Sequence, residues 1–277
     1  QLSRAMSESP LLLFIILVII LLFVAARFLI SNNKPVLENK KKLIIQTLLI
    51  LFTGIMIGIT GGIKLNGFAL LGVGIILFTL LLFFSTYLKT FTIKLKILLL
   101  TCTIVILILA SFSTFISYNP FLYNNTVERT AAIFKWRIHE MKIQTSKSES
   151  ADLTRINLSE RIIVVTNNVF NKYSTISFKG AFILNLTLFL FGFILALKNS
   201  LQFLNGSKGN LAHLILIISS IVVAGPSLLT PLNWDRYFYL PVIFSTIFIS
   251  IGISQILRFI YVKYVLQQFT TRLHAHS

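Results

Sequence analysis

Seven long runs of apolar residues alternate with polar loops along the 277-residue chain. A helix needs roughly 20 mainly apolar residues to cross the hydrocarbon core of a bilayer. Five runs approach or exceed this length: Leu11–Ile30, Phe68–Leu88, Ile97–Ile116, Leu211–Leu229 and Tyr239–Ile260. Two shorter runs, Leu43–Ile59 and Ala181–Leu197, fit the lower end of the range. The pattern predicts an all-α fold: a polytopic integral membrane helix bundle with seven transmembrane helices.

The composition agrees with this prediction and affects how the high net positive charge is interpreted. Hydrophobic residues make up 56% of the chain, and the mean hydropathy of +0.86 lies far above that of a soluble domain. A net charge of +17 would suggest nucleic acid as the partner of a soluble protein. Here the basic residues flank the spans, so we expect the bilayer as partner and no nucleic acid. The lone cysteine, Cys102, excludes an intramolecular disulfide and a cysteine metal cluster.

Lysine and arginine residues gather in alternate loops, which predicts the orientation of the chain. The first, third and fifth loops and the C-terminal tail are rich in them: Lys34, Lys40, Lys41 and Lys42; Lys89, Lys94 and Lys96; Lys198 and Lys208; Lys263 and Arg272. The second loop has Lys64 alone and the sixth has Arg236 alone. Because basic loops stay in the cytoplasm, the N-terminus is predicted outside and the C-terminus inside. The long fourth loop then lies outside, on the same face as Arg236.

This arrangement divides the chain into three predicted segments. Residues 1–116 form a four-span membrane segment, and residues 117–179 form the external loop. Residues 180–277 form a three-span segment with a charged mouth and a basic cytoplasmic tail.

The external loop is predicted to be helical in two places. Ala131–Met141 is an amphipathic helix for the membrane interface, with Phe134, Ile138 and Met141 on one face. Gln144–Asp152 is polar and is predicted to be a connector. A second helix follows the cap residue Asn157. Its predicted apolar stripe is Leu158, Ile162, Val165 and Val169.

Two arginines, Arg155 and Arg161, lie near the start of that second helix. Arginine at a helix N-terminus opposes the helix dipole. Either the two side chains are simply solvated, or they contribute to a site for an anion.

The clearest functional candidate is Trp234-Asp235-Arg236-Tyr237, at the mouth of the last span. Ionisable groups at this depth are costly unless they are paired or bind a ligand. The planar guanidinium of Arg236 suits a lipid phosphate, and Asp235 would orient the phosphate or a sugar. Alternatively, Asp235 and Arg236 pair, or Arg236 snorkels, to anchor the helix end. Trp234 and Tyr237 either line a sugar or isoprenoid site or belong to the interfacial aromatic belt.

Other motifs give no catalytic centre. The four histidines show no metal spacing, the acids form no paired-carboxylate motif, and no phosphate-binding or dinucleotide fingerprint occurs. We therefore expect no metal and no cofactor. Within the spans, Gln46, Asn185 and Gln255 are predicted to hydrogen-bond to neighbouring helices, and Gly54 and Gly58 to form a small packing face.

The run from Thr230 to Pro241 resembles a segment near the C-terminus of bacterial phospholipid-carrier-dependent glycosyltransferases of the GT-C superfamily, which includes protein O-mannosyltransferases and the aminoarabinose transferase of lipid A. The stretch from Phe134 to Met141 is less specifically similar to their external loop. The resemblance implies an enzyme of the bacterial cytoplasmic membrane. It would move a sugar from a polyprenyl-phosphate carrier to an acceptor lipid, glycan or protein outside.

The chain departs from that family in one respect. The resemblance places the catalytic acid in the first external loop, but Thr60–Gly67 contains neither Asp nor Glu. We therefore expect the C-terminal portion of a longer enzyme, with the catalytic loop elsewhere. The alternative is a non-catalytic membrane subunit, or a transporter that handles an anionic lipid.

Overall fold

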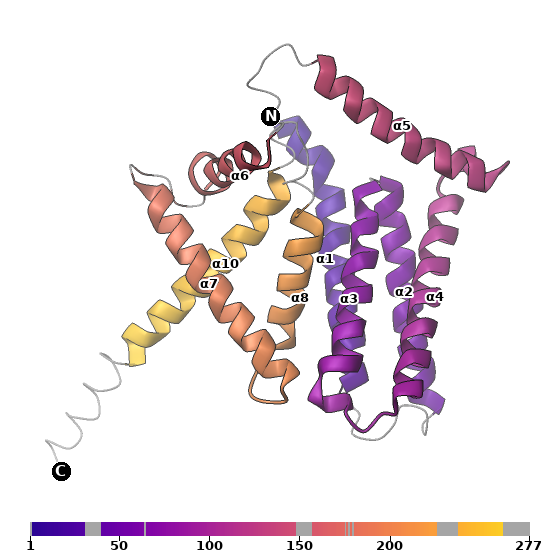
Figure 1. Ribbon diagram of the computed structural model, residues 1–277, viewed down its shortest axis with the longest axis horizontal. Coiled ribbons are helices and arrows are strands. Elements are labelled where there is room, and N and C mark those ends of the chain that lie inside the picture. The colour runs from indigo at the N-terminus through magenta and orange to yellow at the C-terminus, as the bar shows by residue number, and fades with distance from the viewer. Residues whose placement is uncertain are drawn as a thin grey trace, which may run out of the picture. The chain divides into compact units, whose positions relative to one another are not determined.

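The computed structural model describes residues 2–30, 40–63, 65–147, 157–174, 176, 178, 180–225 and 238–262 (Figure 1). Every regular element in these ranges is a helix, which confirms the all-α prediction. The chain forms two compact units. Unit 1 consists of Gln1–Thr154 and Asn199–Pro226, and unit 2 consists of Arg155–Lys198 and Ser227–Ser277.

Unit 1 holds five of the predicted spans and one crossing helix. Its elements are α1 (Leu2–Ile30), α2 (Lys40–Ile63), α3 (Ala69–Phe84), α4 (Ile93–Ser117), α5 (Thr126–Lys147) and α8 (Leu211–Ser219), which continues as a π-helical turn, η6 (Ser220–Ala224). Short 3-10 turns, η2 (Leu65–Phe68), η3 (Thr86–Leu88) and η4 (Pro120–Leu122), lie between them. Helices α1 to α4 and α8 run side by side, whereas α5 crosses their ends (Figure 1).

Glycines set the close packing of α2 on α4. A Cβ atom added to Gly54 would lie 2.7 Å from the Cβ atom of Ala110, and one added to Gly58 would meet the backbone of Ser111. Helices in lipid gain no hydrophobic energy from association, so small residues that let backbones approach are a main source of their attraction. The predicted packing face of Gly54 and Gly58 is thus confirmed.

The two ends of unit 1 differ in the residues that they carry. At one end, beside α5 in Figure 1, Gly62 of α2 faces Tyr118 after α4, and Gly72 in the first turn of α3 faces Val222 of η6. We call this the α5 end. At the other end, the rings of Tyr87 and Phe203 lie 5.4 Å apart, which joins η3 to the α7–α8 connection. We call this the lysine end, because Lys89 and Lys208 belong to these two turns.

Unit 2 is smaller. It contains α6 (Leu158–Asn167), the π-helical turn η5 (Asn168–Lys172), most of α7 (Ala181–Leu204) and α10 (Tyr239–Ile260). Helices α7 and α10 cross at Gly192 and Gly252, where a Cβ on Gly252 would lie 2.7 Å from the carbonyl oxygen of Leu188. Beside the crossing, Phe248 packs edge-on against Phe189 and Phe193.

Five helical segments are long and apolar enough to cross a membrane: Leu12–Ile30, Leu43–Gly62, Ile93–Ser117, Ala181–Leu204 and Tyr239–Ile260. They indicate an integral membrane protein. Two other predicted spans are shorter helices, Ala69–Phe84 and Leu211–Ala224. At 1.5 Å per residue these reach about 24 and 21 Å, against a hydrocarbon core of about 30 Å. The count of seven therefore stays a prediction.

A backbone break explains the shortness of α3. Ser85 is extended, and its side chain accepts a hydrogen bond from the backbone N–H of Tyr87, which starts η3. The apolar run continues to Leu88, but the helix does not. At the end of η6 the sequence reads Gly225-Pro226, and proline cannot continue a helix.

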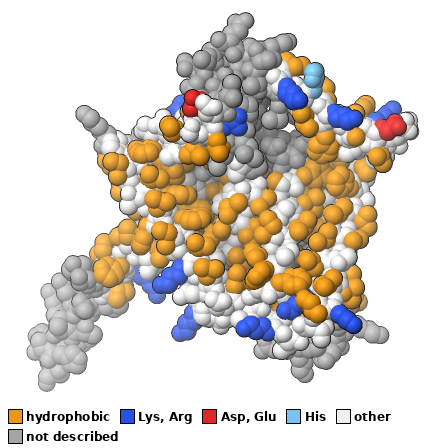
Figure 2. Space-filling model, viewed as in Figure 1, with side chains coloured by type: hydrophobic (Ala, Val, Ile, Leu, Met, Phe, Trp, Pro, Cys, Tyr) orange, Lys and Arg blue, Asp and Glu red, His pale blue; other side chains and the backbone are white. Residues whose placement is uncertain are grey.

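Many apolar side chains are exposed on the face that Figure 2 shows. On α1 the residues Leu13, Ile16, Ile20 and Val24 are exposed, while Val18 and Leu22 are fully buried. An aqueous surface would not favour such a stripe, whereas the hydrocarbon of a bilayer does.

Candidate functional site

The structure describes the neighbourhood of the predicted mouth but not its four residues. Trp234, Asp235, Arg236 and Tyr237 lie outside the described residues, as does Arg155. Arg161 is described, in α6. The described chain resumes at Phe238, which is covalently joined to Tyr237. The side chains around Phe238 are therefore the described part of the site.

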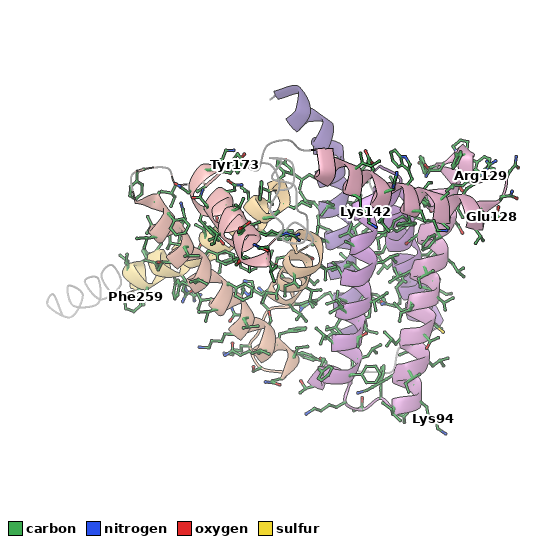
Figure 3. All side chains as sticks on the ribbon, turned by 45° about the horizontal axis from the view of Figure 1, so that its top comes forward. Lys94, Glu128, Arg129, Lys142, Tyr173 and Phe259 are labelled. Carbon is green, nitrogen blue, oxygen red and sulfur yellow. The ribbon has the colours of Figure 1, made fainter. Side chains whose placement is uncertain are left out.

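Phe238 anchors the start of α10. Its side chain is 2% exposed and stacks on the ring of Tyr173, with the ring centroids 6.4 Å apart and the planes inclined by 23°. The Nζ atom of Lys172 lies 4.8 Å from the centroid of the Tyr173 ring, a cation–π contact. A basic and aromatic group therefore surrounds the residue that follows the predicted mouth. Tyr173 is labelled in Figure 3.

The π-helical turn η5 puts Lys172 and Tyr173 in this position. The backbone N–H of Tyr173 donates to the carbonyl of Asn168, at 2.9 Å, which closes the wide turn. As a result, three consecutive residues, Asn168, Val169 and Phe170, are buried, whereas Lys172 and Tyr173 retain exposed surface. Single π turns occur frequently at functional sites.

Asn185 of α7 stabilises this turn through side-chain hydrogen bonds. Its side chain is fully buried, and Nδ2 donates to the carbonyl oxygens of Phe170, at 3.2 Å, and Ile176, at 2.9 Å. The two acceptors fix the orientation of the amide, and Oδ1 has no hydrogen-bond partner. Asn185 thus joins η5 and the loop after it to α7.

The other polar residues predicted to bond across helices behave differently. Gln46 is buried, but its Oε1 has no partner. Gln255 is exposed on α10, and its predicted hydrogen bond to a neighbouring helix stays a prediction.

Arg161 lies on the partly buried face of α6. Val165 and Asn168 lie on the same face, four and seven residues later. Asn168 is the first residue of η5. Of the predicted apolar stripe, Leu158 and Ile162 are exposed, Val165 is half-buried and Val169 is buried. Helix α6 does begin after Asn157 as predicted, although the Asn157 side chain makes no capping hydrogen bond.

We call Lys172, Tyr173 and Phe238 the α10-mouth cluster. It joins one cation and two aromatic rings. Such a set can bind an anionic group and an apolar chain. Among the described residues, no group of three or more His, Cys, Asp or Glu side chains could hold a metal ion.

Sequence reasoning missed Lys172, Tyr173 and Phe238. A signal was present, because a basic residue followed by a tyrosine ends the helical pattern of the same long loop. The π turn that positions these residues could not be predicted, because the apolar spacing of a sequence indicates only the regular α-helical period.

No protein-family model, curated protein or solved structure matches this chain. The resemblance of the segment from Thr230 to Pro241 therefore stays a prediction from sequence.

Proposed function

We propose that this chain is the membrane-embedded portion of a glycosyltransferase that uses a sugar carried on a polyprenyl phosphate. Arg236 binds the carrier phosphate, Asp235 orients it or the sugar, and Trp234 and Tyr237 line the site. The acceptor is a lipid, glycan or protein outside the cytoplasmic membrane. Seven spans, with the N-terminus outside and the C-terminus inside, belong to the same proposal.

The observation that carries this proposal is the α10-mouth cluster beside the segment that resembles the family. Arg236 is two residues from Phe238, so chain connectivity keeps their Cα atoms within about 7 Å. Phe238 contacts Tyr173, and Tyr173 contacts Lys172. In this proposal Lys172 supplies a second cation for the phosphate, and the two rings contact the isoprenoid beside it.

A second function rests on a missing catalytic acid. Because Thr60–Gly67, where the resemblance places the catalytic acid, has no carboxylate, the chain would bind the carrier without transferring the sugar. It would then be a non-catalytic subunit or a transporter for an anionic lipid.

Binding to a polyprenyl monophosphate tests the shared part of both functions. The whole chain is placed in nanodiscs, and its affinity for the monophosphate and for the uncharged polyprenol is measured by native mass spectrometry. We expect Arg236→Ala to weaken phosphate binding about ten- to a hundred-fold, because a hydrogen bond to a charged group contributes about 1.5–3 kcal/mol. Arg236→Lys keeps the charge without the planar fork and should recover part of the loss.

Lys172→Gln should weaken binding of the monophosphate and leave polyprenol binding unchanged. Lys208→Gln, at the lysine end of unit 1, is the matched control and should change neither. If Arg236→Ala lowers thermal stability and leaves phosphate binding intact, the arginine is an anchor and the proposal fails. Sugar transfer from the loaded carrier, assayed with the longer enzyme that the first function implies, separates the enzyme from the subunit or transporter.

A further inference from the structure

Helix α5 has a half-buried face, here called the packed face, and its first turns are held to η4. Its half-buried residues recur at helical spacing: Arg129, Thr130, Ile133, Glu140 and Ile143. The guanidinium of Arg129 donates to the carbonyl of Phe121 and lies 4.9 Å from the centroid of the Phe121 ring. Thr126 donates to the carbonyl of Leu122, at 2.9 Å. These contacts tie the first turns of α5 to η4, and so to the end of α4.

Beside the packed face runs an exposed apolar stripe. Val127, Phe134 and Ile138 are 83%, 40% and 57% exposed and share one side of the helix, at spacings of seven and four residues. Their neighbours include Ala131, also exposed. Trp136 is 58% exposed, on the other side of the packed face. Apolar groups therefore flank the packed face on both sides.

The remaining face of α5 is polar and mainly basic. Lys135 and Lys142 are exposed, seven residues apart, and share this face with Glu128 and His139. Over its whole length α5 contains five basic and two acidic residues. Figure 3 shows Arg129 and Glu128 at the end of α4 opposite to Lys94, and Lys142 farther along α5.

The position of α5 suits the headgroup layer. Helix α4 has 25 residues and is about 37 Å long, which exceeds the hydrocarbon core of about 30 Å. A helix that crosses the end of α4 therefore lies near the level of the lipid phosphates. There, apolar flanks reach the acyl chains while lysines reach the phosphates.

We propose that α5 binds the surface of the protein's own bilayer and prefers anionic phospholipids, through Lys135 and Lys142 above the stripe of Val127, Phe134 and Ile138. The occupant is a lipid headgroup layer because it offers negative charge directly above hydrocarbon, in the same order as the two exposed faces. This surface is independent of the α10-mouth cluster.

Tryptophan quenching tests the proposal. The chain has two tryptophans, Trp136 and Trp234, so Trp234→Phe leaves Trp136 of α5 as the single reporter. The protein is reconstituted in bilayers that contain either brominated phosphatidylcholine or brominated phosphatidylglycerol at equal mole fraction. Trp136 should be quenched more strongly by the anionic lipid, and the difference should shrink at high salt because exposed charges are screened.

The double replacement Lys135→Gln with Lys142→Gln should remove the preference for the anionic lipid. Each lysine contributes about fivefold to the affinity for the anionic lipid relative to phosphatidylcholine. Lys94→Gln with Lys96→Gln, at the lysine end, is the matched control and should keep it. Phe134→Ser with Ile138→Ser should reduce quenching by both lipids. Equal quenching by the two lipids at low salt would overturn the preference. Quenching by aqueous iodide and by neither lipid would place α5 in water, as for a protein partner, and overturn the proposal.

Discussion

At the scale of single residues, Gly58 and Gly62 give a matched test of the α2–α4 packing. A Cβ at Gly58 would collide with the Ser111 carbonyl, whereas one at Gly62 would lie 3.8 Å from the nearest Tyr118 atom, an ordinary contact. We expect Gly58→Ala to lower the free energy of unfolding by about 1–3 kcal/mol, as overpacked sites do.

Gly62→Ala should be neutral or slightly stabilising, because alanine is the better helix former by roughly 1 kcal/mol. Thermal unfolding of both variants in the same detergent, followed by circular dichroism, measures the difference. Equal melting temperatures for the two variants would contradict close packing at Gly58.

Asn185 is the second residue whose role can be measured. Asn185→Leu has a similar volume but leaves the carbonyls of Phe170 and Ile176 without their donor. We expect a loss of about 1–3 kcal/mol, the usual cost of buried polar groups without partners, and faster hydrogen exchange in η5. Gln255→Leu, on an exposed part of α10, is the control. If Asn185→Leu melts like the wild type, Asn185 does not hold the turn.

At the scale of elements, most helices were predictable, and the failures have local causes. Helix α10 begins and ends where the sequence predicts, since Pro241 is tolerated in the first turn of a helix. Helix α3 is shorter than its apolar run because Ser85 adopts an extended conformation. Helix α5 reaches Lys147, so residues 144–147, which were predicted to belong to a connector, are helical.

The candidate site was less predictable than the helices. Hydropathy located the mouth of α10 but could not show that Tyr173 stacks on Phe238, because this contact joins distant parts of the sequence through a π turn. For Asn185, the residue type indicated a hydrogen bond, but its acceptors, two backbone carbonyls, depend on the tertiary fold.

Helix α5 should depend on Arg129 for its attachment. Arg129→Ala removes both the hydrogen bond and the ring contact to Phe121, and we expect the amides of the first turns of α5 to exchange several-fold faster with solvent. Lys94→Ala, at the lysine end, is the control for loss of a positive charge. Hydrogen exchange in the first turns of α5 is measured by mass spectrometry for both variants, each reconstituted in bilayers. Unchanged exchange in Arg129→Ala would show that the other packed residues suffice.

At the scale of the whole molecule, orientation in the membrane is the central prediction. In a Cys102→Ser background, a cysteine at Ser148 should react with an impermeant maleimide from outside the cell. A cysteine at Lys208, in the α7–α8 connection, should react only after the membrane is opened. The reason is that basic loops remain in the cytoplasm. The reverse pattern would invert the topology and remove the α10 mouth from the outer face.

The crossing of α7 and α10 has a consequence for the order of biogenesis. Gly192 and Gly252 meet backbone to backbone, yet α7 leaves the ribosome seconds before α10, at about 5–20 residues per second. During that interval the surface of α7 around Gly192 is not yet covered by α10 and is accessible to lipid or to quality-control proteases. A bulkier residue at Gly192 should therefore reduce the amount of protein that accumulates in the membrane, more than it impairs the molecules that complete assembly.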